Sequence, residues 1–480
     1  MGTLRMPEKP PPLPGRAVPG ILSTRTRTMG TRASFFRMDR STLAIQTAMV
    51  VGALLTLLGV GQLILNEPTD AVPLLVIAPV GLLGLRLLVN RLAEGEDLDF
   101  LVNVMSAGLL LRLGLALVIH FSLPIWFFAP DQITYQEVGL QTLRYHQGLG
   151  PIPWQIQNTA ELGYFYWNAF LYWVFGYAPL APKLVNAFVG TASALLCYRL
   201  AGELAGKGPA RLAALLTMFF PSLVLWSTLN LRDPIVLLLT LALFLNVVRL
   251  RVRPSGRAFF GVVLALALLV LFRDYIAVMA VFGLIGATFI SRGRGIPVNL
   301  LLAGVLFGIA VFAYQQFGLG TQWVESASFE AIAQQRQNMA FGGTAFRPDA
   351  DISTPLRGLQ FIPIGLAFFL LSPFPWQTGS LLSMMTLPEQ LVWYALLPTV
   401  VGGAVYLVRN RYHAFGPVLV FLALTSGIYA LVEGNAGTAY RHRAQVLVFF
   451  LVIAAVGLTV RRLKREQREA ATTRSGRHRP

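Results

Sequence analysis

The sequence predicts an all-α polytopic membrane protein with about 12 transmembrane helices and two interfacial or re-entrant segments. Of its 480 residues, 55% are hydrophobic and only 13% are charged, whereas a soluble domain carries about 25% charge. The mean hydropathy is +0.61. Apolar stretches of roughly 18 residues or more recur along the chain, and a helix of that length can cross a bilayer. A β-barrel would show short alternating segments instead.

The apolar stretches divide the chain into four parts. Residues 1–42 are Pro-rich and basic without an apolar core, which predicts a disordered cytoplasmic tail rather than a signal peptide. Residues 43–98 hold two extra spans, 99–460 the main transmembrane domain, and 461–480 a second basic tail. The predicted spans lie near 43–65, 71–91, 101–125, 180–200, 210–227, 234–250, 258–272, 275–291, 297–316, 391–408, 415–432 and 444–460.

Two weaker apolar stretches, 162–178 and 358–374, are short and interrupted by glycine, proline and aromatic residues. Such segments suit an interfacial or re-entrant position better than a full crossing. They belong to the long loops 126–179 and 317–390. Loops of this length can build a structured cap on one face of the membrane.

The basic residues predict the topology. The net charge is +17, and arginines cluster in short loops near Arg199, Arg249, Arg292 and Arg409 and in the tail after Arg461. With about 12 crossings all these groups lie on one side, which the positive-inside rule assigns to the cytoplasm. We therefore expect a multi-pass protein of the plasma (inner) membrane with both termini cytoplasmic. Membrane lipids, and no nucleic acid, are the expected surroundings of these basic residues.

An acidic residue opens the first long outer loop. In FFAPDQITYQEVGLQTLRYHQGLG, residues 127–150, Asp131 follows a span directly and Tyr135 comes one helical turn later. The stretch 132–147 is weakly amphipathic and predicts a helix at the interface. The stretch 161–179 predicts a second helix, whose tyrosines and tryptophans suit interfacial anchoring. Asp131 is a candidate functional carboxylate, and the alternative is a helix-capping or loop carboxylate.

Two Arg-Asp doublets lie at outer span boundaries. They are Arg232 with Asp233 in LNLRDPIV and Arg273 with Asp274 in LFRDYIA. Adjacent side chains diverge on a helix, so each doublet offers its two charges to different partners. Asp233 precedes Pro234 and is also typical of a helix N-cap. Arg232 lies near the positive end of the following helix, where an anion is favoured.

A third group of charged residues lies directly before the last predicted span. Arg441, His442 and Arg443 lie in EGNAGTAYRHRAQVLVFF, on the predicted outer face. Together with Arg232 and Arg273 these arginines form a set whose planar donors suit phosphate oxygens. The alternative is simple pairing with Asp233, Asp274 and Glu433. His442 is interpreted as a hydrogen-bonding or structural imidazole, and the alternative is a catalytic one.

Two further outer segments have open interpretations. The segment 317–357 contains QQRQNMAFGGTAFRPDADIS and suits either a mobile loop over a site or an ordinary connector. The segment 371–379, LSPFPWQTG, breaks the apolar pattern with two prolines. Backbone that leaves helical form at membrane depth lines a cavity or the protein interior.

Cofactor motifs are absent from the sequence. There is no H-E-x-x-H, no P-loop and no dinucleotide fingerprint. The single cysteine, Cys197, lies in an apolar segment and excludes an intrachain disulfide. We therefore expect no required cofactor and assign no metal ligand, while a divalent metal remains compatible with the outer carboxylate.

These features together resemble the GT-C superfamily of polyprenyl-phosphate-sugar-dependent membrane glycosyltransferases, of the protein mannosyltransferase and lipid A aminoarabinose transferase type. Asp131, the stretches 132–147 and 161–178 and the span from about 180 follow the order of the family's first outer loop. The family's usual acidic pair is reduced here to Asp131 beside Gln132. The residues that match the following section are Gly176, Pro179, Asn186, Pro221, Arg232 and Asp233.

The resemblance implies an inverting transfer of a sugar to a glycan, lipid or protein acceptor on the extracytoplasmic face. Asp131 would activate the acceptor hydroxyl, and arginines would hold the lipid phosphate as leaving group. The implied substrate-binding residues are Tyr135, Arg232, Asp233, Arg273, Asp274, Arg441, His442 and Arg443. The alternatives are a polysaccharide polymerase or ligase, a transporter or flippase of lipid-linked glycans, and a structural subunit of a membrane complex.

Overall fold

The computed structural model describes residues 40–66, 70–93, 95–158, 162–290, 304, 308, 328–342, 344–377 and 381–476. Met38–Pro480 form one compact unit, and the rest of the account concerns this unit. Residues 1–39 of the predicted tail 1–42 lie outside the described residues, as does nearly all of the predicted span 297–316.

The described residues fold as helices and connecting segments, without a named strand. From the N-terminus the helices are α1 (Arg40–Asn66), α2 (Ala71–Leu92), α3 (Glu96–Ser122), α4 (Asp131–His146), α5 (Trp154–Asn158), α6 (Leu162–Phe175), α7 (Leu180–Ala205), α8 (Lys207–Phe219) and α9 (Pro221–Trp226). They continue as α10 (Asp233–Val252), α11 (Gly256–Phe272), α12 (Asp274–Ile290), α15 (Phe329–Met339), α16 (Pro355–Leu371), α17 (Leu381–Val432) and α18 (Ala436–Gly476). The prediction of an all-α fold is confirmed.

Seven of the described helices are long and apolar enough to cross a membrane, so the chain is a membrane-embedded protein. The seven segments are Ile45–Leu65, Ala71–Leu92, Glu96–Ser122, Leu180–Ala205, Asp233–Val252, Ser383–Val432 and Ala436–Thr472. Six of them match the predicted spans near 43–65, 71–91, 101–125, 180–200, 234–250 and 444–460, with boundaries that differ by up to five residues for the spans 43–65, 71–91, 101–125, 180–200 and 234–250.

Some predicted spans take a different form. The stretches 391–408 and 415–432 are the exception: they are two helices that meet at a kink with non-helical backbone at Arg411, and α17 covers both. The stretch 210–227 is divided into α8 and α9 where Phe220 is extended and Pro221 starts the next helix. The stretch 258–272 lies in α11 and residues 275–290 lie in α12, and each of these helices has only 17 residues. The number of crossings therefore stays a prediction.

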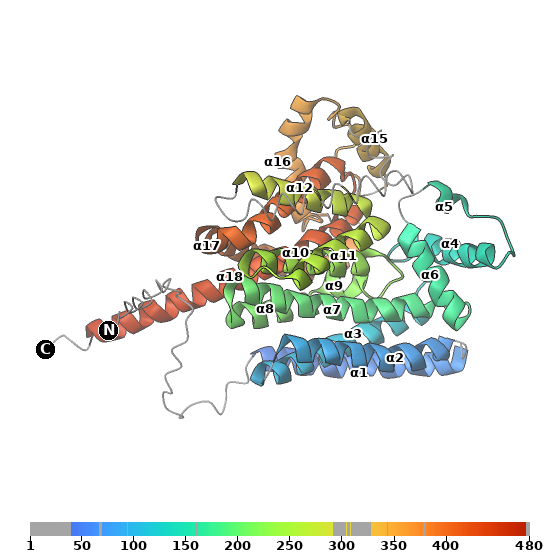
Figure 1. The fold of residues 1–480 in the computed structure, drawn as a ribbon, viewed down its shortest axis with the longest axis horizontal. Helices are drawn as coiled ribbons and strands as arrows, with labels where there is room; N and C mark the ends of the chain where they lie inside the picture. The colour runs from blue at the N-terminus through green and yellow to red at the C-terminus, as the bar shows by residue number, and fades with distance from the viewer. Residues whose placement is uncertain are drawn as a thin grey trace, which may run out of the picture. The chain divides into compact units, whose positions relative to one another are not determined.

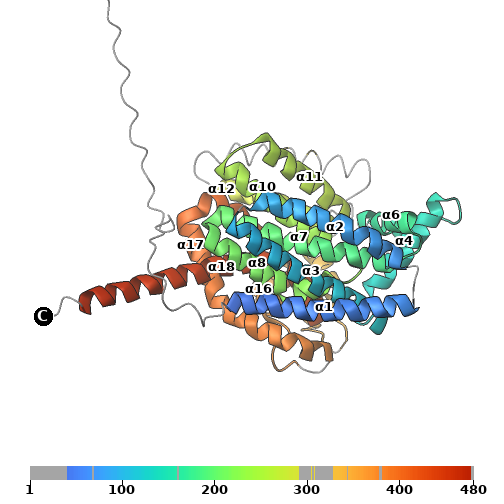
Figure 2. The same ribbon diagram turned by 90° about the horizontal axis from the view of Figure 1, so that it is seen from below.

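The helices have two chemically different ends. In Figure 1, α4 and α6 lie at one end of α7, and the C-terminal part of α18 extends from the opposite end of the helices. Figure 2 shows the same arrangement from below. Near that second end, Arg199 and Arg249 both reach Glu203 at 3.5 Å, and Lys207 reaches Asp97 at 3.2 Å. We call it the basic end. The loops predicted to be cytoplasmic at Arg199, Lys207 and Arg249 therefore converge.

Glycines allow neighbouring helices to approach closely. A Cβ atom at Gly403 of α17 would lie 2.0 Å from the carbonyl oxygen of Ile453 in α18. A Cβ at Gly457 of α18 would lie 1.9 Å from the carbonyl oxygen of Thr399. The N-terminal span α1 packs on α3 in the same way, because a Cβ at Gly114 would lie 2.8 Å from the carbonyl oxygen of Gly52. Small residues at such crossings are typical of helix packing in membranes.

The two weaker stretches form the short helices α6 and α16. α6 packs against α11, since a Cβ at Gly163 would lie 2.6 Å from the carbonyl oxygen of Leu271. α16 ends at Leu371, where the predicted break begins. The helices predicted at 132–147 and 161–179 are confirmed as α4 and α6, and they contact each other.

Candidate functional site

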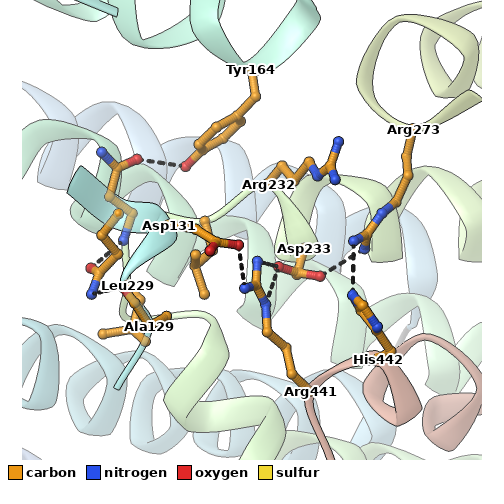
Figure 3. A network of polar contacts seen from close by, with 12 residues as sticks. Ala129, Asp131, Tyr164, Leu229, Arg232, Asp233, Arg273, Arg441 and His442 are labelled. Atoms are coloured by element: carbon orange, nitrogen blue, oxygen red, sulfur yellow. Dashed lines mark hydrogen bonds and ion pairs between the residues drawn. The ribbon is translucent and has the colours of Figure 1, made fainter. Parts of the chain in front are cut away.

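Arg441 joins two carboxylates from distant parts of the chain. Its Nη1 donates to Asp131 Oδ2 at 2.6 Å, and its Nε and Nη2 donate to Asp233 Oδ2 at 3.0 and 2.7 Å. The two aspartates are 310 and 208 residues from Arg441 in sequence. Asp131 is the first residue of α4, and Asp233 is the first residue of α10. Figure 3 shows the guanidinium between the two carboxylates.

Arg273 completes the pairing of Asp233. Its Nη1 donates to Asp233 Oδ1 at 2.8 Å, and its side chain is only 2% exposed. The interpretation of Asp233 as a side-chain N-cap is wrong, because Arg232 occupies the N-cap position and no side-chain cap bond is formed. Two guanidinium groups supply stronger partners for the carboxylate than a backbone N–H does.

His442 and Glu433 extend the network away from Asp233. His442 Nε2 lies 3.3 Å from Arg273 Nη2, and His442 Nδ1 bonds the carboxylate of Glu433. Because arginine only donates, Nε2 accepts and the proton lies on Nδ1. Thr438 donates to the other oxygen of Glu433 at 2.6 Å. We call Glu433, His442, Arg273, Asp233, Arg441 and Asp131 the charged cluster.

Exposure differs sharply along the charged cluster. The Asp131 side chain is 53% exposed, whereas Asp233 is 5% and Glu433 0% exposed. Asp131 is therefore the member that an external substrate reaches first. Its Oδ1 receives no hydrogen bond from the part of the chain that the structure describes. This arrangement offers one open carboxylate oxygen beside a buried, oriented guanidinium.

The other predicted site residues occupy varied positions. Arg232 lies beside the charged cluster (Figure 3), and its Nη1 is 3.5 Å from the carbonyl oxygen of Phe272. Asp274 begins α12, and its Oδ1 accepts from the backbone N–H of Tyr275 at 2.7 Å. Tyr135 is 2% exposed and packs edge-on against Tyr164 at 4.8 Å between ring centroids. Tyr135 is a residue of α4, and its buried ring packs this helix against α6.

Arg443 lies apart from the charged cluster. Its Nη1 donates to the carbonyl oxygens of Leu370 and Ser372, both at 2.9 Å, and its Nη2 donates to Gln390 Oε1 at 3.0 Å. It is 1% exposed. Residues two apart on a helix point to different sides, so Arg441 and Arg443 cannot both face one substrate. Placing Arg443 with the other arginines is therefore wrong. It fixes the break after α16 instead, where backbone carbonyls need donors.

The sequence analysis missed a buried amide network that holds the cluster in place. Gln132 Oε1 accepts from the backbone N–H of Asn230 at 3.0 Å, next to Asp131. The Nδ2 of Asn186 donates to the carbonyl oxygens of Leu229 and Leu231 at 2.7 and 2.8 Å. The segment before Arg232 is thereby tied to α4 and α7. Gln132, which stands where the resemblance leads us to expect an acidic residue, thus holds the segment before Arg232 against the start of α4.

Two other buried polar groups also escaped the sequence analysis. Arg112, in the middle of α3, is 0% exposed and donates from Nε to Ser227 Oγ at 3.0 Å. His120 lies 3.1 Å from both Asp70 Oδ2 and Lys183 Nζ. A lone charge inside an apolar stretch is a usable signal for such groups. For Arg112 that signal was present in the sequence.

Part of the loop 317–357 docks on the turn that carries Glu433. The backbone N–H of Phe346 donates to the carbonyl oxygen of Gly434 at 2.7 Å, and Arg336 Nη2 donates to the carbonyl oxygen of Phe346 at 2.7 Å. Burial lowers the pKa of Arg336 to about 10 although Glu433 opposes this. A Cβ at Gly434 would lie 2.7 Å from the carbonyl oxygen of Arg336. Glycine therefore permits this close contact.

Metal ligands do not gather in the described residues: no group of three or more His, Cys, Asp or Glu side chains could hold an ion there. The two aspartates of the cluster are already bridged by Arg441.

The described part of the chain is an all-helical, membrane-embedded protein with a largely buried arginine–carboxylate cluster, open at Asp131, at the ends of several helices. No protein-family model matches the chain, and the search of curated proteins finds no relative. The function is therefore inferred from the residues and their geometry.

Proposed function

We propose that the chain is an integral membrane glycosyltransferase. It transfers a sugar from a polyprenyl-phosphate donor to a glycan, lipid or protein acceptor at the extracytoplasmic face. The observation that carries the proposal is the contact between a half-exposed carboxylate, Asp131, and the guanidinium of Arg441 at 2.6 Å. A general base for the acceptor and a cation for the leaving group are thus available to one substrate.

Several features favour an anion at the charged cluster. Helices α4, α10 and α12 begin at Asp131, Asp233 and Asp274, and helix N-termini attract negative charge. Arg441 uses its Nε, one Nη1 hydrogen and one Nη2 hydrogen in bonds to the aspartates. A guanidinium has five N–H donors, so two remain for phosphate oxygens. The adjacent guanidinium of Arg232 adds positive charge.

The proposed reaction follows from these positions. The acceptor hydroxyl attacks the anomeric carbon, a new C–O bond forms, and the C–O bond to phosphate breaks. The hydroxyl proton passes to Asp131, and polyprenyl phosphate departs with the bonding electrons. Attack opposite the leaving group inverts the anomeric configuration. Arg441 and Arg232 stabilise the charge that grows on the phosphate, which is the largest contribution in many such sites.

Incubation of the purified protein with labelled polyprenyl-phosphate sugars tests this proposal. We expect label to move from the donor lipid to an added acceptor, with polyprenyl phosphate as the second product. Product length separates the transfer of one sugar from polymerisation or ligation of a glycan. Retention of label on the lipid with every sugar and acceptor class supplied would contradict the proposal.

A further inference from the structure

The helices α4 and α6 pack against each other, but their exposed faces differ in chemistry. The exposed residues of α6 are aromatic or aliphatic and are each between 42% and 65% exposed; they are Tyr166, Phe170, Trp173 and Val174. Such a face suits the boundary of the membrane, where tyrosine and tryptophan are enriched. We therefore expect the free face of α6 to contact lipid.

The exposed face of α4 is polar instead. Its exposed residues are Asp131, Thr134, Glu137, Gln141, Arg144, Tyr145 and His146, and none of them is an aliphatic residue. Polar groups are costly to place in hydrocarbon, so this face lies in water. Glu137 and Arg144 carry opposite charges, which leaves the face with little net charge. The two packed helices thus separate an aqueous side from a lipid side.

Some of the exposed residues of α4 form a line that starts at the charged cluster. Thr134, Gln141 and Tyr145 follow Asp131 at spacings of three, seven and four residues, so they lie on one side of the helix. We call Asp131, Thr134, Gln141 and Tyr145 the polar line. At about 1.5 Å per residue it is about 21 Å long. Tyr145, at its far end, is 39% exposed and offers an aromatic ring. The open carboxylate thus continues into an elongated hydrophilic surface.

The residues of this surface limit the chemistry of its partner. A lipid acceptor needs an apolar surface beside Asp131, and the exposed face of α4 offers none. A protein partner is usually held by apolar and aromatic residues at the centre of an interface, whereas Thr134 and Gln141 occupy the centre here. Hydroxyl and amide groups instead exchange hydrogen bonds with sugar hydroxyls. The ring of Tyr145 can cover the apolar C–H face of a sugar.

We propose that α4 binds a water-soluble, uncharged oligosaccharide acceptor along the polar line, an inference that rests on the proposed function. The terminal sugar presents its hydroxyl to Asp131, and the following sugars contact Thr134, Gln141 and Tyr145. The acceptor therefore enters from water, while the donor lipid stays in the membrane. Gln141 and Tyr145 are specificity-determining residues that act only on an acceptor long enough to reach them.

Transfer assays on the full-length protein in lipid nanodiscs test the inference, with labelled polyprenyl-phosphate sugars as donors. The acceptors are maltose and maltoheptaose, the matching short and long oligomers of mannose and galactose, dioleoylglycerol, and a serine-rich peptide. We expect transfer to an oligosaccharide, with kcat/KM about 10-fold higher for the long acceptor than for the short one.

Combining Gln141→Ala with Tyr145→Ala should remove this advantage and leave the rate with the short acceptor unchanged, because both side chains contact only the distant sugars. Alanine is a good helix former, so α4 is retained. Trp173→Ala is the matched control, since Trp173 is an exposed aromatic residue on the lipid side of α6. This control should keep the advantage of the long acceptor.

The advantage is a ratio within each variant, so a fraction of inactive protein does not alter it. Equal kcat/KM for long and short acceptors in wild type, or an advantage that survives the double substitution, overturns the inference. Transfer only to dioleoylglycerol or the peptide also overturns it, as does an equal loss with Trp173→Ala. The proposed function stands in each of these cases. Absence of transfer to every acceptor overturns both proposals.

Discussion

Arg441 depends on the planar shape of its guanidinium, because this group bridges Asp131 and Asp233 with three hydrogen bonds. Lysine keeps the charge but lacks this fork. We expect Arg441→Lys to lower transfer about 100- to 1,000-fold, the usual effect of losing a preorganised donor. The measurement is the initial rate with labelled donor.

The matched control is Arg461→Lys on the same helix, where Arg461 donates to the carbonyl oxygen of Pro398. Its rate should equal that of wild type. Normal activity of the Arg441→Lys variant would remove the guanidinium from the mechanism.

Glu433 acts through His442 rather than on the substrate. It is fully buried, accepts from His442 and Thr438, and so orients the imidazole against Arg273. Glu433→Gln keeps an acceptor but loses the charge. We expect kcat to fall about 10- to 100-fold through misplacement of Arg273, with KM for the acceptor changed little. Glu203→Gln at the basic end is the control, and equal losses in both variants would argue for a general structural effect.

At the scale of helices, α17 and α18 pack so closely that a Cβ atom at Gly403 or Gly457 would clash with the backbone of the other helix. Gly403 faces α18 there, whereas a Cβ at the neighbouring Gly402 would contact nothing within 4 Å. Gly403→Ala should therefore destabilise the protein by about 1–3 kcal/mol through overpacking, and Gly402→Ala should not. Thermal unfolding in detergent measures both. Equal melting temperatures for the two variants would contradict the packing.

Sequence patterns predicted most helices because a crossing helix needs a long apolar run, whatever its partners. They failed where local backbone geometry decides where a helix begins or ends. Pro221 divides the predicted span 210–227 into α8 and α9, whereas the boundary predicted between 408 and 415 is found as the kink at Arg411. Helical geometry alone could have separated Arg443 from Arg441. One partner of Gln132, Asn230, lies 98 residues away, and nothing in a single sequence encodes such a pairing.

For the whole molecule, the topology is the prediction that most needs a direct test. Gln147 follows α4, whose first residue Asp131 belongs to the charged cluster, and Arg253 follows α10, whose first residue Asp233 belongs to it too; both Gln147 and Arg253 are exposed. The only native cysteine, Cys197, is buried. An impermeant maleimide on intact cells should label Gln147→Cys but not Arg253→Cys, which should react only after lysis. The reverse pattern would place the cluster on the cytoplasmic side.

The fold brings one exposed carboxylate, two largely buried guanidinium groups and the N-termini of several helices to a common end of the membrane-embedded helices. These groups come from α4, α10, α18 and the junction of α11 with α12. Because the residues of the charged cluster come from several helices, we expect the transfer activity to be lost when the helix bundle unfolds.

The most direct test of the central claim compares Asp131→Asn with Asp351→Asn. Both side chains are 53% exposed, and both pair with an arginine. Only Asp131 belongs to the charged cluster. With labelled donor and equal amounts of folded protein, we expect Asp131→Asn to lose about 100- to 10,000-fold in transfer rate, the range for loss of a general base. Asp351→Asn should keep the wild-type rate. Full activity of Asp131→Asn would contradict the account.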